Sequence, residues 1–151
     1  MRKVVAAKLH GLYVTDANLN YHGSITLDPE HCEAAGIFPL EFVDIWNKQS
    51  GARISTYVIF GERGSRVCCL NGAAARTCQA GDQVIICSSV FMVANEIENI
   101  HPRVLTFHPD NSIKDSLYYD VEQTGGGKLR FSIRDARHDG EALGIPLRAV
   151  S

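Results

Sequence analysis

Apolar and polar residues follow a strand-like pattern over short stretches of this chain. The clearest stretches are residues 4–9, 53–60, 83–93 and 104–107, which are rich in β-branched residues. Short stretches of this kind, separated by turn residues, predict strands, and no long helical stretch lies between them. The sequence therefore predicts a mainly β chain and favours a small closed barrel over a doubly wound α/β fold.

Weaker stretches predict further strands at residues 12–15, 24–27, 41–47 and 66–70. Helical signals are few and local. Asp28 followed by Pro29 is typical of a helix start and Gly36 of a helix stop, so residues 30–35 fit one or two turns. Single short helical segments are expected at residues 73–76 and 95–99.

The last part of the chain, residues 113–151, differs from the rest. Residues 117–123 and 128–134 flank three consecutive glycines, and apolar and polar residues alternate in the second stretch. This pattern predicts a β-hairpin. Because a strand rather than a helix follows the glycines, they favour a turn over a phosphate-binding loop. We expect residues 1–112 to form the barrel and the remainder to form an extension.

Composition narrows the classes of function. The chain has 151 residues, enough for one domain, and 45% of them are hydrophobic, so a real core can form. Fifteen Lys and Arg residues against seventeen Asp and Glu leave no basic surplus for binding nucleic acid. No apolar run approaches the roughly 18 residues that span a bilayer. Residues 1–11 also lack the apolar core of a signal peptide, which favours a cytoplasmic protein.

The five cysteines, at positions 32, 68, 69, 78 and 87, form no known pattern. Their number is odd, no C-x-x-C pair occurs, and two adjacent residues of a strand point to opposite faces. The six histidines likewise show no spacing typical of metal ligands. We therefore expect reduced, buried thiols and no metal site.

One predicted strand carries candidate chemistry. A period of two places Arg53, Ser55 and Tyr57 on one face, and Ile54 and Thr56 on the other. An arginine can bind a carboxylate through two hydrogen bonds, and a tyrosine hydroxyl can donate a proton. The same pattern is also that of an ordinary solvated strand face, which is the commoner case.

Five separated motifs give a more specific indication. In this order and spacing, they resemble the bacterial L-aspartate 1-decarboxylase family over residues 1–112. The segment after about residue 116 is longer than the usual family ending and unlike it. The motifs are KLHGLYVTDANLNYHGS at 8–24, DIWN at 44–47, STY at 55–57, ERGSR at 62–66 and NGAAA at 71–75.

The resemblance implies a six-stranded double-psi β-barrel, assembled as a homotetramer with active sites between neighbouring subunits. It also implies a covalent pyruvoyl cofactor, made by self-cleavage between Gly23 and Ser24. In that chemistry the Ser24 hydroxyl attacks the preceding carbonyl to give an ester. Elimination and hydrolysis then leave a pyruvoyl group at position 24, and glycine on the acyl side tolerates the strained backbone of such an attack.

The pyruvoyl group of the family forms a Schiff base with L-aspartate and accepts electrons as CO₂ leaves. The product is β-alanine, which feeds pantothenate and coenzyme A biosynthesis. By the same resemblance, Tyr57 is the proton donor, and Lys8 and Arg53 hold the two carboxylates of aspartate, in an order left open. Thr56 contacts substrate and takes part in self-processing.

Further residues match the family's site with less defined roles. Gly72, Ala73 and Ala74 match a loop whose backbone contacts substrate, and small side chains there let N–H groups approach an anion. The residues that match the lining of the site are His10, Tyr21, Trp46 and Asn71.

Thr56 raises a conflict between the two lines of reasoning. Alternation places it on the opposite face from Arg53 and Tyr57, whereas the family uses all three around one site. A β-bulge, or a site built between subunits, would reconcile the two.

Two alternative functions compete with aspartate decarboxylation. One is decarboxylation of a related acid such as glutamate, because one methylene changes binding by only about 1–3 kcal/mol. The other is a β-barrel that only binds a ligand or partner. Ser24 and Tyr57 are both present, which favours an enzyme. A partner protein that assists self-cleavage is compatible with the sequence.

Overall fold

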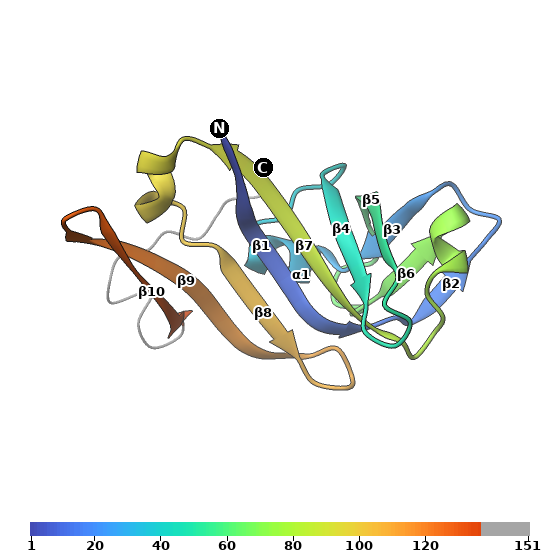
Figure 1. The fold of residues 1–151 in the computed structure, drawn as a ribbon. Helices are drawn as coiled ribbons and strands as arrows, with labels where there is room; N and C mark the ends of the chain where they lie inside the picture. The colour runs from blue at the N-terminus through green and yellow to red at the C-terminus, as the bar shows by residue number, and fades with distance from the viewer. Residues whose placement is uncertain (137–151) are drawn as a thin grey trace.

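Ten strands and three short helices make up the part of the chain that the computed structural model describes, residues 1–136. The predicted mainly β class is confirmed. In chain order the elements are β1 (Arg2–Tyr13), β2 (Asp16–Asn18), β3 (Ser24–Leu27), α1 (Pro29–Ala35), β4 (Phe42–Asn47), β5 (Arg53–Phe60), β6 (Cys68–Asn71), η1 (Gly72–Arg76), β7 (Gln83–Met92), η2 (Ala94–Asn99), β8 (Arg103–Phe107), β9 (Ile113–Gly125) and β10 (Lys128–Asp135) (Figure 1).

The strands are hydrogen-bonded in the order β10-β9-β8-β1-β7-β4-β5-β3-β6-β2. Most neighbours are antiparallel, but β1–β8, β2–β6 and β3–β5 are parallel pairs. Each parallel pair joins strands that are distant in the sequence. This mixed order is consistent with the expected double-psi arrangement.

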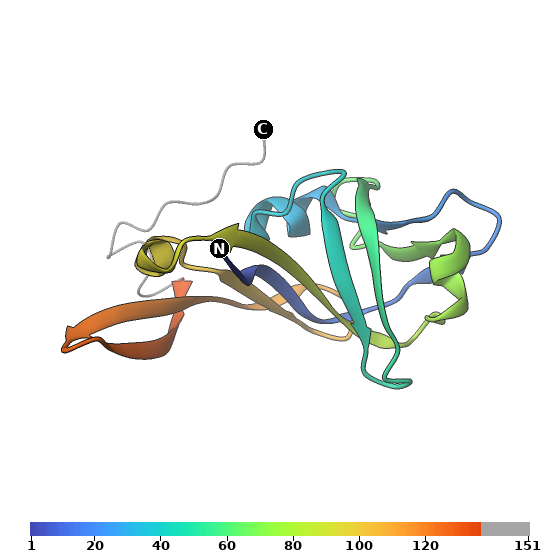
Figure 2. The ribbon, with the colours of Figure 1, turned by 45° about the horizontal axis from the view of Figure 1, so that its top comes forward.

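The elements divide into two ends with β4 and β5 between them (Figure 2). The β9–β10 hairpin and β8 lie at one end, next to the long strands β1 and β7. At the other end, β3, β6 and β2 gather around η1 (Figure 1). The β3–β6 end carries Ser24 and Asn71, and β1 carries Lys8 and His10, so the predicted site residues are spread over both parts.

β1 is one strand of twelve residues where the sequence predicted two. Its pairing with β7 shifts register between Val5 and Ala7, and again between His10 and Leu12. Gly11 lies at the second shift with φ of +83°, and a Cβ there would come 2.7 Å from Nε2 of Gln83. Glycine thus permits a bulge that displaces the alternation by one residue without ending the strand.

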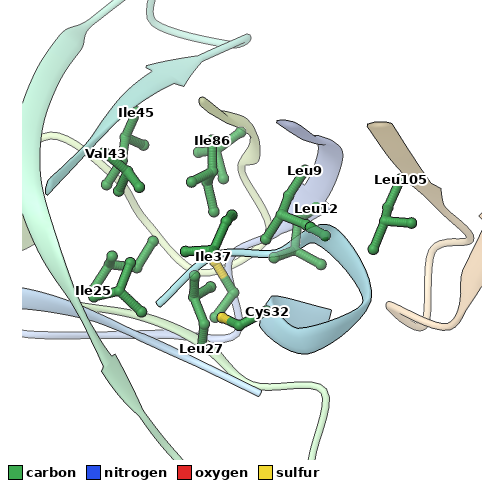
Figure 3. Packing of buried hydrophobic residues seen from close by; sticks show 14 of the residues in the cluster. Leu9, Leu12, Ile25, Leu27, Cys32, Ile37, Val43, Ile45, Ile86 and Leu105 are labelled. Atoms are coloured by element: carbon green, nitrogen blue, oxygen red, sulfur yellow. The ribbon is translucent and has the colours of Figure 1, made fainter. Parts of the chain in front are cut away.

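Apolar side chains from the strands and from α1 pack together in one core (Figure 3). Four of the five cysteines are buried and all five are free, as predicted. Burial raises the pKa of the Cys32 thiol to about 12, so this side chain behaves as a small apolar residue. The labelled core residues are Leu9, Leu12, Ile25, Leu27, Cys32, Ile37, Val43, Ile45, Ile86 and Leu105.

α1 begins and ends where the sequence predicted. The side chain of Asp28 accepts a hydrogen bond from the Glu30 N–H at 2.9 Å, Pro29 occupies the first turn, and Gly36 ends the helix with φ of +81°. A short polar side chain at the start and a glycine past the end satisfy backbone groups that the helix itself cannot.

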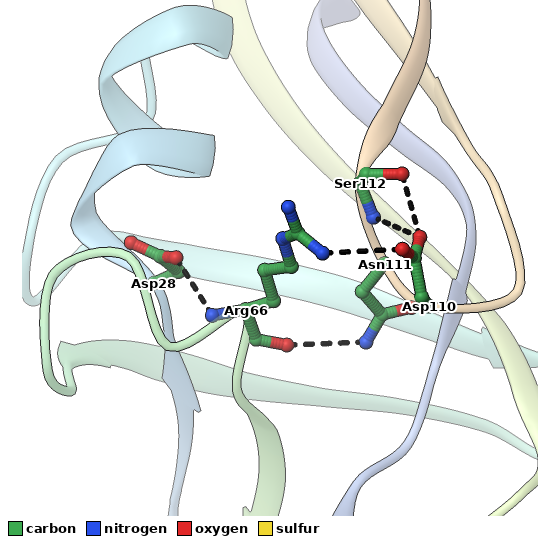
Figure 4. Close-up of polar contacts among 5 residues, drawn as sticks. All are labelled: Asp28, Arg66, Asp110, Asn111 and Ser112. Atoms are coloured by element: carbon green, nitrogen blue, oxygen red, sulfur yellow. Dashed lines mark hydrogen bonds and ion pairs between the residues drawn. The ribbon is translucent and has the colours of Figure 1, made fainter.

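Asp28 also joins segments beyond its own helix (Figure 4). Its carboxylate accepts from the backbone N–H groups of Gly64 at 3.0 Å and Arg66 at 2.8 Å. The Arg66 carbonyl in turn accepts from Nδ2 of Asn111 at 3.1 Å, and the Arg66 guanidinium pairs with Asp110 at 3.2 Å. This network ties the end of β3 to the loop before β6 and to the turn between β8 and β9.

The predicted C-terminal hairpin is present as β9 and β10. Phe131 faces Val121 and Ile133 faces Tyr119 across it. The first half of β9 also pairs with β8, and Tyr118 there is fully buried. Residues 113–118 therefore continue the main sheet, and β10 extends beyond it.

No helix of residues 1–136 is long and apolar enough to cross a membrane.

Candidate active site around Ser24

Ser24 is the first residue of β3, and its side chain is buried. Its Oγ accepts a hydrogen bond from Nδ2 of Asn71 at 2.9 Å and donates to the His22 carbonyl at 3.3 Å. Antiparallel pairing of β3 with β6 places Ser24 directly opposite Asn71. The hydroxyl is thus held in one orientation beside the Gly23–Ser24 peptide bond.

Asn71 connects Ser24 to two further side chains. Only 2% of Asn71 is exposed, so each polar atom of its amide needs a partner within the protein. Nδ2 also donates to Oγ1 of Thr26 at 2.8 Å, and Oδ1 accepts from Sγ of Cys69 at 3.4 Å. Antiparallel pairing places Thr26 opposite Cys69, two residues along from the Ser24–Asn71 pair. All four side chains therefore share one face of the β3–β6 pair.

The segment that leads to Ser24 packs against the start of η1. Gly72 has φ of +65°, and a Cβ there would lie 3.0 Å from the Tyr21 carbonyl oxygen and closer still to the backbone of Gly23. Ala73 and Ala74 follow in the same short helix. The first residue of the predicted loop, Gly72, therefore lies directly against the backbone before the Gly23–Ser24 bond.

Arg53 and Tyr57 lie on one face of β5, as alternation predicted. Arg53 pairs with Trp46 on β4, and its Cζ lies 4.8 Å from the centroid of the Trp46 ring. Tyr57 pairs with Phe42, with ring centroids 6.0 Å apart. The stacked guanidinium keeps its hydrogen-bond donors available at the edge of the ring, where an anion can reach them.

Thr56 lies on the opposite face of β5, paired with the buried Val43. No register shift interrupts the pairing of β5 with β4 or with β3. The explanation by a β-bulge, which would have turned Thr56 toward Arg53 and Tyr57, is therefore wrong. Within one chain, the side chains of Thr56 and Tyr57 project from opposite faces of the sheet.

Parallel pairing of β3 with β5 relates Ser24 to Tyr57. Ile25 is paired with Val58, and both are core residues. Ser24 precedes Ile25 as Tyr57 precedes Val58, so both project to the face away from the core. The register thus brings the serine and the proposed proton donor onto one face of neighbouring strands.

Lys8 and His10 lie on the same face of the sheet as Arg53, but on β1, which is several strands away from β5 and β3. His10 pairs with Ile85, which pairs with Trp46, and Trp46 pairs with Arg53. β1 is separated from β5 by three strand spacings, about 14 Å along the sheet, and from β3 by four, about 19 Å. Lys8 and His10 are therefore separated from Ser24 along the sheet by the strands β7, β4 and β5.

The charge state of His10 follows from its neighbours. Burial lowers the pKa of its imidazole, and the positive charges of Lys8 and Lys48 lower it further. The ring is therefore neutral at pH 7, and positive charge on this part of the face comes from the lysines. Among residues 1–136, no cluster of three His, Cys, Asp or Glu side chains could hold a metal ion.

Sequence reasoning missed Thr26 and Cys69. Each stands two residues from a predicted site residue on the same strand, so alternation alone could have placed both beside Ser24 and Asn71. Tyr21 was predicted to line the site, and it lies about half exposed in the segment that contacts Gly72.

Comparison with known proteins gives a consistent result. The model of the aspartate decarboxylase family matches residues 1–114. Aspartate 1-decarboxylase of Methylobacterium nodulans is 68% identical over 137 residues, which are 91% of this chain and 90% of that protein. The Xanthobacter autotrophicus protein of that name is 66% identical over 148 residues, 98% of this chain and 97% of that protein.

A third relative shows how far the likeness extends. Aspartate 1-decarboxylase of Beijerinckia indica is 62% identical over 149 residues, 99% of this chain and 98% of that protein. A match of this length includes the C-terminal extension as well as the part that the family model covers. The extension is therefore shared with relatives and is not peculiar to this chain.

Proposed function

This chain belongs to the aspartate decarboxylase family and is a carboxy-lyase of aspartate, and we propose that it works with a pyruvoyl group made from its own Ser24. The observation that carries this proposal is the contact of Asn71 Nδ2 with Ser24 Oγ, at 2.9 Å in a buried environment. A buried serine with an amide donor on its oxygen, next to a glycine carbonyl, suits self-cleavage.

The proposed maturation begins at the Gly23–Ser24 peptide bond. Oγ of Ser24 attacks the Gly23 carbonyl carbon and the C–N bond breaks. The proton of the hydroxyl passes to the leaving nitrogen, so that an ester with a free α-amino group remains. Loss of the Ser24 α-proton expels the carboxylate of Gly23. Water then replaces the nitrogen, which leaves as ammonia, and a pyruvoyl group caps the chain. Asn71 stabilises negative charge on Oγ as the hydroxyl loses its proton.

The residues around position 24 fit such a group. A pyruvoyl group there can only accept hydrogen bonds, and Nδ2 of Asn71 points a donor at this position. When present, the group supplies a carbonyl that captures the substrate amine and accepts electrons as CO₂ departs. The other requirements of the reaction, which are binding of two carboxylates and delivery of a proton, fall to side chains of the protein.

We assign carboxylate binding and proton delivery to side chains on the face of the sheet opposite the core. Arg53 binds one carboxylate of aspartate through its guanidinium, and Tyr57, on the strand next to Ser24, returns a proton to the α-carbon. Gly72 lies against the backbone of Gly23, and Ala73 and Ala74 follow it in η1, so we assign all three to the lining of the same site. Thr56 would contribute from the other face of β5 only through a second chain.

Lys8 and His10 would complete the site from a neighbouring copy. β1, which carries both residues, lies four strands along the sheet from β3, which carries Ser24. This strand order is compatible with a site between the subunits of a homotetramer, which the resemblance to the family implies. The product, β-alanine, would supply pantothenate and coenzyme A biosynthesis in the cytoplasm.

An intact-mass spectrum under denaturing conditions tests the proposal. The expected result is two species: residues 1–23, and a chain from position 24 that carries pyruvoyl in place of serine. A Ser24→Ala variant is the control and should give one uncleaved mass. An uncleaved wild-type chain, both alone and with a host-cell extract, would contradict the proposal. Cleavage only with extract would indicate a maturation partner.

A competition assay tests the substrate. Purified, cleaved protein is supplied with equal concentrations of aspartate and glutamate, and the two amine products are quantified. We expect β-alanine to predominate. Preferential loss of glutamate would favour the related-acid alternative instead.

A further inference from the structure

The thiol of Cys69 donates a hydrogen bond to the side chain of Asn71, which in turn donates one to Ser24. Sγ of Cys69 is 3.4 Å from Oδ1 of Asn71, and Nδ2 of Asn71 is 2.9 Å from Oγ of Ser24. The next acceptor of the thiol, the Leu70 carbonyl, is more distant at 3.9 Å. The three side chains thus form a short relay across the β3–β6 pair.

The Asn71 amide has two nearly isosteric orientations. At one end of the amide, the Ser24 hydroxyl donates its proton to the His22 carbonyl at 3.3 Å and therefore accepts from Nδ2. A protonated thiol donates its hydrogen and is a poor acceptor from an amide. At the other end, Cys69 donates to Oδ1 at 3.4 Å, so the thiol supports the same orientation, with Nδ2 toward Ser24.

We infer that Cys69 is a positioning residue for self-cleavage, and that its S–H group satisfies the buried Oδ1 of Asn71 and so helps to hold Nδ2 toward Ser24. This inference rests on the proposed function. With Nδ2 toward Ser24, the amide stabilises the negative charge on Oγ as the hydroxyl loses its proton, just before the attack on Gly23. The flipped amide would present Oδ1 there, hold the serine proton and oppose that charge.

The thiol remains a donor under ordinary conditions. Burial raises the pKa of Cys69, and the carboxylate of Asp16 raises it further. Asp16 faces Cys69 across the parallel β2–β6 pair. The sulfur therefore carries its hydrogen at neutral pH, as the relay requires.

The test compares cleavage rates of newly made protein. Cell-free translation is stopped with an inhibitor, and the fraction of cleaved chain is followed by intact mass. Cys69→Ala and Cys69→Val both remove the donor, and the second keeps the volume. We expect roughly two- to tenfold slower cleavage in each, because a net hydrogen bond is worth about 0.5–1.5 kcal/mol. Cys69→Ser keeps a donor and should cleave at the wild-type rate or faster.

A matched control separates the loss of a donor from the loss of a thiol. Cys78 is buried in the core and lies outside the relay, so Cys78→Ala should cleave at the wild-type rate. Wild-type cleavage by Cys69→Val, or equal slowing in Cys69→Val and Cys69→Ser, would overturn the inference. Failure of the wild type itself to cleave would instead contradict the proposed function, so the two failures are distinguishable.

Discussion

Gly72 lies directly against Gly23, the residue that precedes the proposed cleavage point. A Cβ built on Gly72 would come within 2.8 Å of the Gly23 Cα and 2.9 Å of its N atom. Real Cβ atoms do not approach backbone so closely, and a backbone cannot yield as the end of a flexible side chain can. The absence of a side chain at position 72 therefore sets the path of the chain that enters Ser24.

A Gly72→Ala substitution should impair both folding and self-cleavage. Its φ of +65° strains any L residue by about 1–2 kcal/mol, and the clash adds about 1–3 kcal/mol. Displacement of Gly23 should also slow cleavage at least tenfold, since small misplacements of reacting groups are costly. Denaturant unfolding and intact mass measure the two effects.

Gly51→Ala is the matched control for this prediction. Gly51 has φ of +75°, but a Cβ there meets nothing within 4 Å. The Gly51→Ala variant should lose only the stability that backbone strain costs, and its self-cleavage should proceed at the wild-type rate. Equal cleavage rates in the two variants would mean that the contact with Gly23 does not position the bond.

Tyr57→Phe should separate maturation from turnover. The ring keeps its packing against Phe42, and only the hydroxyl is lost. We expect normal appearance of the two chains by mass, with decarboxylation slowed about 10²-fold or more, as for loss of a general acid. Production of β-alanine measures the second step. A variant that turns over aspartate normally would remove Tyr57 from the proton-donor role.

Asp28→Asn should destabilise the fold by about 2–4 kcal/mol. The buried carboxylate accepts from three backbone N–H groups, two at Oδ1 and that of Arg66 at Oδ2. An amide keeps one acceptor oxygen, so its NH₂ group must face at least one of these N–H donors. Denaturant unfolding at pH 7 measures the loss. Asp110→Asn removes an exposed charge near the same network and should change stability by less than about 1 kcal/mol.

The same carboxylate has a predictable dependence on pH. Burial acts to raise the pKa of Asp28, but the three N–H donors outweigh it and the net pKa is lowered. A lowered folded-state pKa means that the stabilisation is fully present above about pH 4 and is lost as the pH falls through the folded value. The stability gap between wild type and Asp28→Asn should therefore narrow below pH 4. A gap that stays constant down to pH 2 would contradict this origin.

Tyr118 and Phe131 should respond differently to truncation, although both belong to the C-terminal hairpin. Tyr118 is fully buried and Phe131 is 59% exposed. Tyr118→Ala should cost about 3–5 kcal/mol, as for a large core residue, and Phe131→Ala about 1 kcal/mol or less. Thermal or denaturant unfolding decides this. Similar small losses would show that β9 is dispensable to the core.

Local features of the fold could be predicted from the sequence alone. The Asp28–Pro29 start and the Gly36 stop placed α1, and alternation gave the bounds of β5 and the opposite faces of Thr56 and Tyr57. These features depend on backbone preferences and side-chain direction of residues adjacent in the chain. The five motifs similarly determined the family, because they are read along the chain.

Only the tertiary structure decided which strands are neighbours. β1 was predicted as two strands because its bulge at Gly11 depends on Gln83 of β7, 72 residues away. The Ser24–Asn71 contact, the relay to Cys69 and the distance of Lys8 from Ser24 follow from strand pairing between segments that are remote in sequence. Such pairing is selected by the burial of a shared core, and no local pattern of residues encodes it.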